Sequence, residues 1–248
     1  TAADKIYIPE DATPRTEKTA KMLAGELKEA SGFDLPVVRG PATGGGISMT
    51  LGGSGAKEGY ELEISERIVL RGNDEPGLHY AGITLMQILR GSMRITDSPE
   101  LRKVKIKDWP DVNLRIISTV GNWKTYNPEE MDLAGQLRWY QDFFNRNVAG
   151  QKFNLCFFSV DYTFFFTGHP DVRRRNAKSS LLDKEFFKII YQLCQDNFIE
   201  LAPQMNWGGH FWINREKYGH LYEPGFKRQG DILAPGFWEL YTGLVDEI

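Results

Sequence analysis

The chain has 248 residues, of which 25% are charged and 41% are hydrophobic, and it carries a formal net charge of −3. This is ordinary globular composition, long enough for one large domain or two modest ones. The small negative charge gives no reason to expect nucleic acid as a partner, and no apolar run reaches the roughly 18 residues of a membrane span. The sequence opens at Thr1 without an initiator methionine, as if a leader had been removed, which favours a secreted or periplasmic location.

The first hundred residues predict a small α+β domain. Apolar runs bounded by glycine or proline predict short strands at 5–10, 34–40 and 46–52. The stretch 59–72 alternates apolar and charged residues, turns and runs back, which predicts a hairpin. Apolar residues at helical spacing predict helices at 14–30 and 74–90.

Two motifs of this region have simple structural explanations. The glycine-rich segment 44–59 lacks the Gly-Lys-Ser/Thr ending of a phosphate loop and does not run directly into a helix, so turns around one strand explain it better. The segment 102–109 alternates basic and apolar residues, which is typical of a solvated edge strand rather than a polyanion site.

Near Asp108 the pattern changes to a longer alternation of strands and helices. Strands are predicted at 113–119, 152–160 and 198–205, and helices at 127–147, 182–197 and 234–248. Three β/α units in succession predict parallel strands with covering helices. We therefore predict two domains, at residues 1–108 and 109–248.

Polar and aromatic residues gather where each of these three strands ends. In parallel α/β folds the carboxyl ends of the strands carry the ligand site. Aromatic residues make up 12% of the chain and crowd into its second half, where they can fill a core or stack on sugar rings. The residues at the strand ends are Ser118 and Asn122, then Asp161 and Tyr162, then Gln204, Asn206, Trp207 and His210.

These stretches together resemble family 20 glycoside hydrolases, the β-N-acetylhexosaminidases. The Gly-Tyr strand, the return strand "IVLRG" and the helix "GLHYAG" follow one another as in the small zincin-like domain that precedes the barrel of that family. "DWPDVNLRIIS", "KFNLCFFSVD" and "IELAPQMNWGGH" are similar to its first three barrel strands. The resemblance implies a zincin-like α+β domain followed by an incomplete (β/α)8 TIM-type barrel.

The resemblance also implies a set of sugar-binding residues. Arg115 matches an arginine that grips the terminal sugar, although a surface salt bridge is its alternative role. Asp161 and His210 match polar residues of the second and third strands, and we expect them to lie within hydrogen-bond reach or one water apart. Trp207 and Trp212 can each be a sugar platform or part of the core.

The sequence departs from the family at charged positions. Gln204 and Asn206 stand where the family has Glu and Asp, and Ile116 replaces the glycine after the arginine. Amides bind hydroxyl groups but do not transfer protons. The family's catalytic Asp-Glu pair follows a fourth strand, so we expect it beyond Ile248. Asp246 and Glu247 are interpreted as a solvated helix end.

We therefore expect part of a retaining hexosaminidase that uses a substrate-assisted mechanism, inactive as these 248 residues alone. The alternatives are another glycosidase with the same leading domain, such as an α-glucuronidase, and a non-catalytic carbohydrate-binding protein. The expected partner is a glycan that contains N-acetylhexosamine. No cofactor is expected, and no metal site, because the histidines lack ligand-like spacing.

Overall fold

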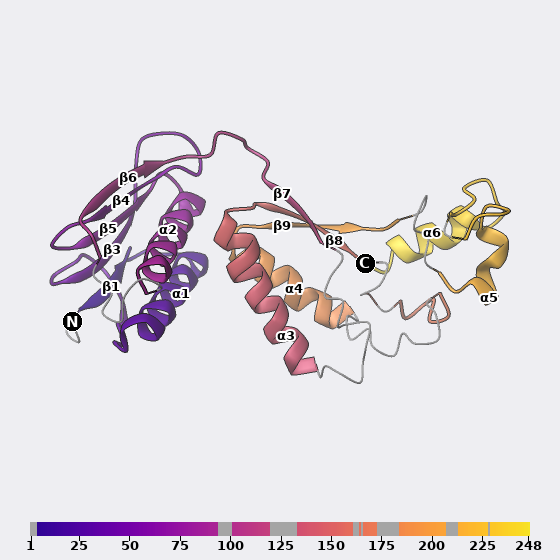
Figure 1. Cartoon of the computed structure of the whole chain (residues 1–248), viewed down its shortest axis with the longest axis horizontal. Coiled ribbons are helices and arrows are strands. Elements are labelled where there is room, and N and C mark those ends of the chain that lie inside the picture. Colours follow the sequence, from indigo (N-terminus) through magenta and orange to yellow (C-terminus); the bar gives the residue numbers. More distant parts are fainter. Residues whose placement is uncertain are drawn as a thin grey trace. The chain divides into compact units, whose positions relative to one another are not determined.

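The computed structural model describes residues 4–93, 101–119, 133–160, 164, 166–172, 184–206, 213–227 and 229–248 (Figure 1). The chain divides into two compact units. Unit 1 runs to Arg115 and includes two short later segments, 149–152 and 196–198, and unit 2 contains the rest. Each unit is a mixed α/β structure with its own sheet.

Unit 1 is built on a six-stranded sheet with the strand order β2-β1-β3-β5-β4-β6. Strands β2, β1, β3 and β5 are parallel to one another, whereas β4 pairs antiparallel with β5 and β6. The β4–β5 pair is the predicted hairpin. The strands are β1 (Lys5–Ile8), β2 (Val37–Arg39), β3 (Gly46–Leu51), β4 (Tyr60–Ile64), β5 (Ile68–Gly72) and β6 (Val104–Asp108).

Two helices, α1 (Pro14–Ser31) and α2 (Glu75–Met93), pack on one side of this sheet (Figure 1). The side chain of Thr13 accepts a hydrogen bond from Thr16 N–H at the start of α1, next to the favourable Pro14. Gly32, at φ 74°, ends α1 in the left-handed conformation that favours glycine. The predicted helix over 14–30 is confirmed to within one residue.

The basic edge strand β6 is held by a ladder of ion pairs. Each lysine of the alternating segment faces a glutamate from β4 or the turn after it: Lys103–Glu66, Lys105–Glu63 at 3.8 Å and Lys107–Glu61 at 3.4 Å. Opposite charges directly across an antiparallel pair stabilise it modestly. The predicted edge strand is confirmed, and its lysines form ion pairs with carboxylates of the same sheet.

Unit 2 contains a three-stranded parallel sheet in the order β7-β8-β9. Its strands are β7 (Ile116–Thr119), β8 (Leu155–Ser159) and β9 (Glu200–Gln204). Its helices are α3 (Leu133–Asp142), which continues as a π-helical turn over Phe143–Val148, α4 (Lys184–Asp196), α5 (Arg215–Tyr218) and α6 (Phe237–Val245). Among the described residues this sheet is not a closed barrel, and the predicted incomplete TIM-type barrel stays a prediction.

Helices α3 and α4 cover one face of this sheet with an aromatic core (Figure 1). The ring of Phe158 on β8 lies 5.7 Å from Tyr140, 6.4 Å from Phe144 and 6.0 Å from Phe187, measured between ring centroids. On the opposite face, Phe157 remains 37% exposed. Strand side chains alternate between faces, so Phe158 joins this aromatic core while its neighbour Phe157 stays outside it.

Candidate functional site

The carboxyl edge of the β7-β8-β9 sheet brings together two of the predicted polar residues. The Ser118 hydroxyl at the end of β7 donates to the side-chain oxygen of Gln204 at the end of β9, at 3.2 Å. The backbone of Gln204 also accepts a hydrogen bond from Val160 N–H at 3.0 Å, which extends the β8–β9 pairing past the strand ends. Asn206 follows, half-buried. The Gln204 side chain thus links the ends of β7 and β9 by a hydrogen bond, at the edge where parallel sheets bind ligands.

The other predicted residues of this edge lie outside the described residues. They are Asn122, Asp161, Tyr162, Trp207, His210 and Trp212. The expected contact between the His210 imidazole and the Asp161 carboxylate, and the choice between sugar platform and core for the two tryptophans, stay predictions.

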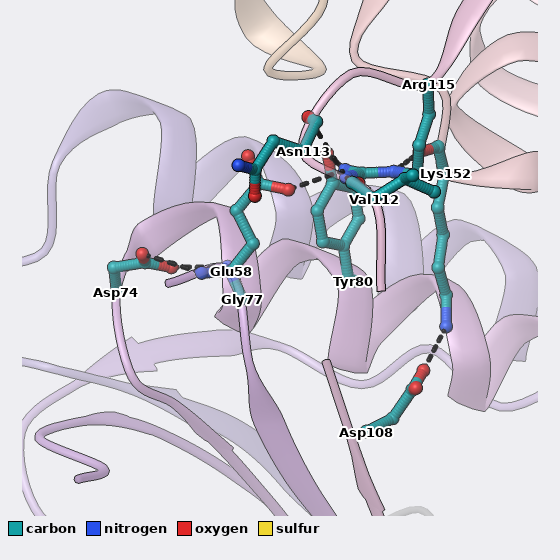
Figure 2. A network of polar contacts seen from close by, with 9 residues as sticks. All are labelled: Glu58, Asp74, Gly77, Tyr80, Asp108, Val112, Asn113, Arg115 and Lys152. Carbon is teal, nitrogen blue, oxygen red and sulfur yellow. Dashed lines mark hydrogen bonds and ion pairs between the residues drawn. The ribbon is translucent and has the colours of Figure 1, made fainter. Parts of the chain in front are cut away.

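Arg115 belongs to unit 1, where its guanidinium contacts a set of protein acceptors (Figure 2). Nη2 bonds Glu58 Oε2 at 2.5 Å and the Tyr80 hydroxyl at 3.0 Å. Nε donates to the carbonyl of Lys152 at 2.6 Å, and Nη1 donates to the carbonyls of Val112 and Asn113 at 3.0 and 3.5 Å. A guanidinium has five N–H donors, and each has a protein acceptor here. The structure therefore shows the salt-bridge role for Arg115, and a sugar contact by this residue stays a prediction.

The partners of Arg115 are themselves fixed. The Glu58 backbone, at φ 61°, donates its N–H to Asp74, whose carboxylate also accepts from Gly77 N–H at the start of α2. The Arg115 and Glu58 side chains are 16% and 13% exposed, so their charges are mostly removed from water. Burial, followed by the negative charge of Glu58, raises the pKa of Tyr80 to about 12, so its hydroxyl stays protonated.

Lys152 extends the network to the end of β6 (Figure 2). Its ammonium donates to Asp108 at 2.9 Å and to the Tyr60 hydroxyl at 2.8 Å, and Tyr60 in turn donates to Asp108 at 2.8 Å. Burial by itself raises the pKa of Asp108, but the hydrogen bonds from Lys152 and Tyr60 outweigh it and lower that pKa overall. The two cations of this network are both paired, Arg115 with Glu58 and Lys152 with Asp108, which favours a structural role.

The end of α6 differs from its prediction. Asp246 is exposed, as expected for a solvated helix end. Glu247 is not: its side chain is only 18% exposed, and its carboxylate accepts hydrogen bonds from the segment 167–169 that follows β8. No local sequence pattern indicates this contact, because the partners lie 78 to 80 positions apart.

Two classes of site receive no support within the described part of the chain. No group of three or more His, Cys, Asp or Glu side chains there could hold a metal ion. None of the described helices combines the length and the apolar character that crossing a bilayer requires. Cys156 and Cys194 are free and buried.

Comparison with known families identifies unit 1. The family described as glycosyl hydrolase family 20, domain 2, matches residues 2–109. This stretch contains the strands, hairpin and helices described above for unit 1, apart from its last residues and the two later segments.

Solved structures match over nearly all of the chain. A chitobiase from Flavobacterium johnsoniae has a TM-score of 0.74 and 14% identity, with 100% of this chain and 40% of that one covered. A β-hexosaminidase from Streptomyces plicatus, in complex with GlcNAc, has a TM-score of 0.73 and 17% identity, covering 100% and 52%. An exo-β-N-acetylglucosaminidase from Vibrio harveyi has a TM-score of 0.69 and 14% identity, covering 98% and 41%. The chain thus spans about half the length of these structures or less, and at this identity the likeness shows a shared fold.

Proposed function

Because residues 2–109 belong to domain 2 of glycosyl hydrolase family 20, we propose that this chain is part of a β-N-acetylhexosaminidase-like enzyme. The observation that carries the proposal is the order of the two units. A family 20 domain 2 is followed, in the same chain, by β/α units, and the whole chain matches solved hexosaminidases. We propose a secreted or periplasmic location for it.

The proposed substrate is a glycan with a terminal N-acetylhexosamine. The S. plicatus and V. harveyi enzymes bind this sugar. In this chain its site would lie at the carboxyl edge of β7-β8-β9, within a TIM-type barrel of which these three units form the first part. Gln204 and Asn206 would bind hydroxyl groups there, together with the predicted Asp161 and His210, and Trp207 or Trp212 would stack on the sugar.

The proposed reaction is substrate-assisted hydrolysis with retention. An aspartate would polarise the 2-acetamido group, which attacks the anomeric carbon, and a neighbouring glutamate would protonate the leaving oxygen. We propose that this Asp-Glu pair follows a further strand beyond Ile248. The residues described here would bind and orient the sugar, since amides at positions 204 and 206 cannot transfer protons.

The proposal is tested with the purified 248-residue chain. We expect calorimetric titration to detect binding of N-acetylglucosamine and chitobiose, and an aryl N-acetylglucosaminide assay to detect no turnover. Gln204→Ala should weaken binding several-fold, about the effect of one hydrogen bond, whereas the exposed Gln229→Ala should not. Turnover that persists in a preparation free of contaminating hydrolase would refute the placement of the catalytic pair.

A specific observation keeps a non-catalytic carbohydrate-binding protein as the second candidate. The amides Gln204 and Asn206 occupy positions where the family has carboxylates, so this edge can bind hydroxyl groups without proton transfer. The residues encoded after Ile248 distinguish the candidates. A strand ending in Asp-Glu supports the hexosaminidase, and a barrel without it supports the binding protein or the α-glucuronidase-like alternative.

A further inference from the structure

A second polar cluster of unit 2 ties the segment after β8 to the end of α6. The Glu247 carboxylate accepts hydrogen bonds from three consecutive residues: the Thr167 hydroxyl at 3.3 Å, Gly168 N–H at 3.0 Å and His169 Nδ1 at 2.7 Å. Three donors on one mostly buried carboxylate fix both the backbone of the segment and the plane of the imidazole.

The close approach depends on two glycines. A Cβ atom at Gly168 would lie 2.9 Å from Glu247 Oε1, and a Cβ atom at Gly243 would lie 2.8 Å from His169 Cε1. Both distances are shorter than side-chain contacts in folded proteins. The His169 ring therefore packs directly on the backbone of α6. A larger residue at position 243 would clash with the ring.

The hydrogen-bond partner sets the proton arrangement of the ring. Burial raises the pKa of Glu247, but the bonds from His169 and Gly168 outweigh it and lower that pKa overall, so the group is a carboxylate at neutral pH. A carboxylate only accepts, so Nδ1 must be the donor. Nε2 then carries the lone pair in the neutral ring and a proton in the charged ring.

Nε2 lies beside Gly243, where a Cβ atom would come within 3.1 Å of it, and glycine leaves that nitrogen uncovered by a side chain. The His169 side chain is 31% exposed, and Nε2 has no partner among the residues that the structure describes. The segment 167–169 belongs to the loop after β8, and loops that follow parallel strands begin at the ligand-binding edge. The predicted sugar residue Asp161 comes from the same loop.

We propose that His169 is a glycan-binding residue, whose Nε2 forms a hydrogen bond with a hydroxyl of a neutral sugar, and that Glu247 is its positioning residue. A hydroxyl fits because it can donate to the neutral ring and accept from the charged one, so the bond survives a change of protonation. A carboxylate or phosphate ligand would need the charged ring. This inference rests on the proposed carbohydrate function.

The test uses the 248-residue chain labelled with ¹⁵N-histidine. The chain has four histidines, and His169→Gln identifies the resonances of His169 while the other three report that the variant is folded. Before sugar is added, the neutral ring of His169 should carry its proton on Nδ1. Saturation with chitobiose should shift the Nε2 resonance. His169→Ala should weaken chitobiose binding about three- to tenfold, the range of one neutral hydrogen bond.

The controls separate positioning from mere folding. Glu247→Gln should abolish the Nδ1–H preference and weaken binding to a similar extent, whereas Glu239→Gln, an exposed carboxylate on the same helix, should change neither. Chitobiose binding that leaves Nε2 unmoved and is unaffected by His169→Ala overturns this inference alone and leaves the proposed function intact. Absence of any sugar binding by the wild-type chain overturns both. Glucuronate binding that exceeds chitobiose binding and disappears as the pH rises would show an acidic ligand and contradict the neutral one.

Discussion

Acidification should destabilise unit 1 through the buried histidine of α2. His79 is 1% exposed, and its Nδ1 lies 2.8 Å from the Thr19 hydroxyl. That hydroxyl donates its proton to the carbonyl of Arg15, so Nδ1–H is the donor toward Thr19, and Nε2 keeps its lone pair. Nε2 has no hydrogen-bond partner within the described part of the chain. Protonation would therefore create a buried N–H without an acceptor, on a charged ring.

The surroundings add to this cost. Burial, followed by the positive charge of Lys18 on α1, lowers the pKa of His79 from 6.5 to about 4. The ring otherwise faces Tyr80 of its own helix and Phe198 of the 196–198 segment, while Asp196 of that segment pairs with Lys18. Thus the carboxylate of Asp196 is already engaged by the lysine.

The sign and size of the effect follow from linkage. The folded-state pKa lies below the unfolded value, so the contribution of His79 is complete above pH 6.5 and is lost as the pH falls toward 4. Between pH 7 and pH 5 the free energy of unfolding should fall by about 2 kcal/mol, and the full shift corresponds to about 3 kcal/mol. Ordinary carboxylates titrate mainly below this window.

Urea unfolding at pH 7, 6 and 5 measures this change in the free energy of unfolding. Hydrogen exchange of peptides from α1 and α2 is a probe specific to unit 1. His79→Phe keeps an aromatic ring but cannot titrate, so it should remove the pH dependence in this window. The exposed His220→Phe should retain it. An identical pH slope in the wild-type chain and His79→Phe would refute the assignment.

Three further predictions concern buried groups. Glu58→Gln leaves the mostly buried guanidinium of Arg115 without its carboxylate and should cost unit 1 about 3 kcal/mol in urea unfolding; a loss below 1 kcal/mol would mean that the pair contributes little. Lys152→Gly relieves a backbone strain of about 1 kcal/mol at φ 58° but removes the ion pair with Asp108, so we expect a net loss of stability. A gain in stability would contradict the structural role of the network. Burial raises the pKa of Cys156 to about 12 and also that of Cys194, so both thiols should react with Ellman's reagent only in denaturant, and reaction under native conditions would contradict their burial.

The local elements of unit 1 could be predicted because their signals are local. Pro14 and Gly32 delimit α1 within the sequence itself, and the alternation in 59–72 determines a hairpin without distant partners. The three parallel strands of unit 2 likewise follow from the spacing of their β/α units. Closure of a sheet into a barrel is different, because it depends on strands that pair at long range, and the pattern of three units does not contain it.

The role of Arg115 could not be predicted from the neighbouring sequence for a related reason. Its carboxylate partner, Glu58, is 57 positions away, and one of its carbonyl partners, Lys152, is 37 positions away. These partners lie in separate segments of the sequence, and no local pattern joins them to Arg115. A motif can assign an arginine to a strand, but the partners of a guanidinium are decided by tertiary packing.

Lys152 and Phe198 show that tertiary packing can require a left-handed backbone conformation at residues other than glycine. Both end a helical segment in a position that usually takes glycine, with φ of 58° and 57°. In each case the next residue donates its N–H five positions back, Phe153 to Val148 and Ile199 to Cys194.

Glycine would remove the strain at both turns, but it would also remove the side chains that unit 1 uses. Lys152 carries the ammonium that binds Asp108, and Phe198 supplies the ring beside His79. Sequence patterns predict a helix end from glycine, so they do not predict the left-handed turns at these two positions. The strained turn and the partly exposed side chain explain each other only when both are seen together: the contacts that each side chain makes offset a backbone cost of about 1 kcal/mol.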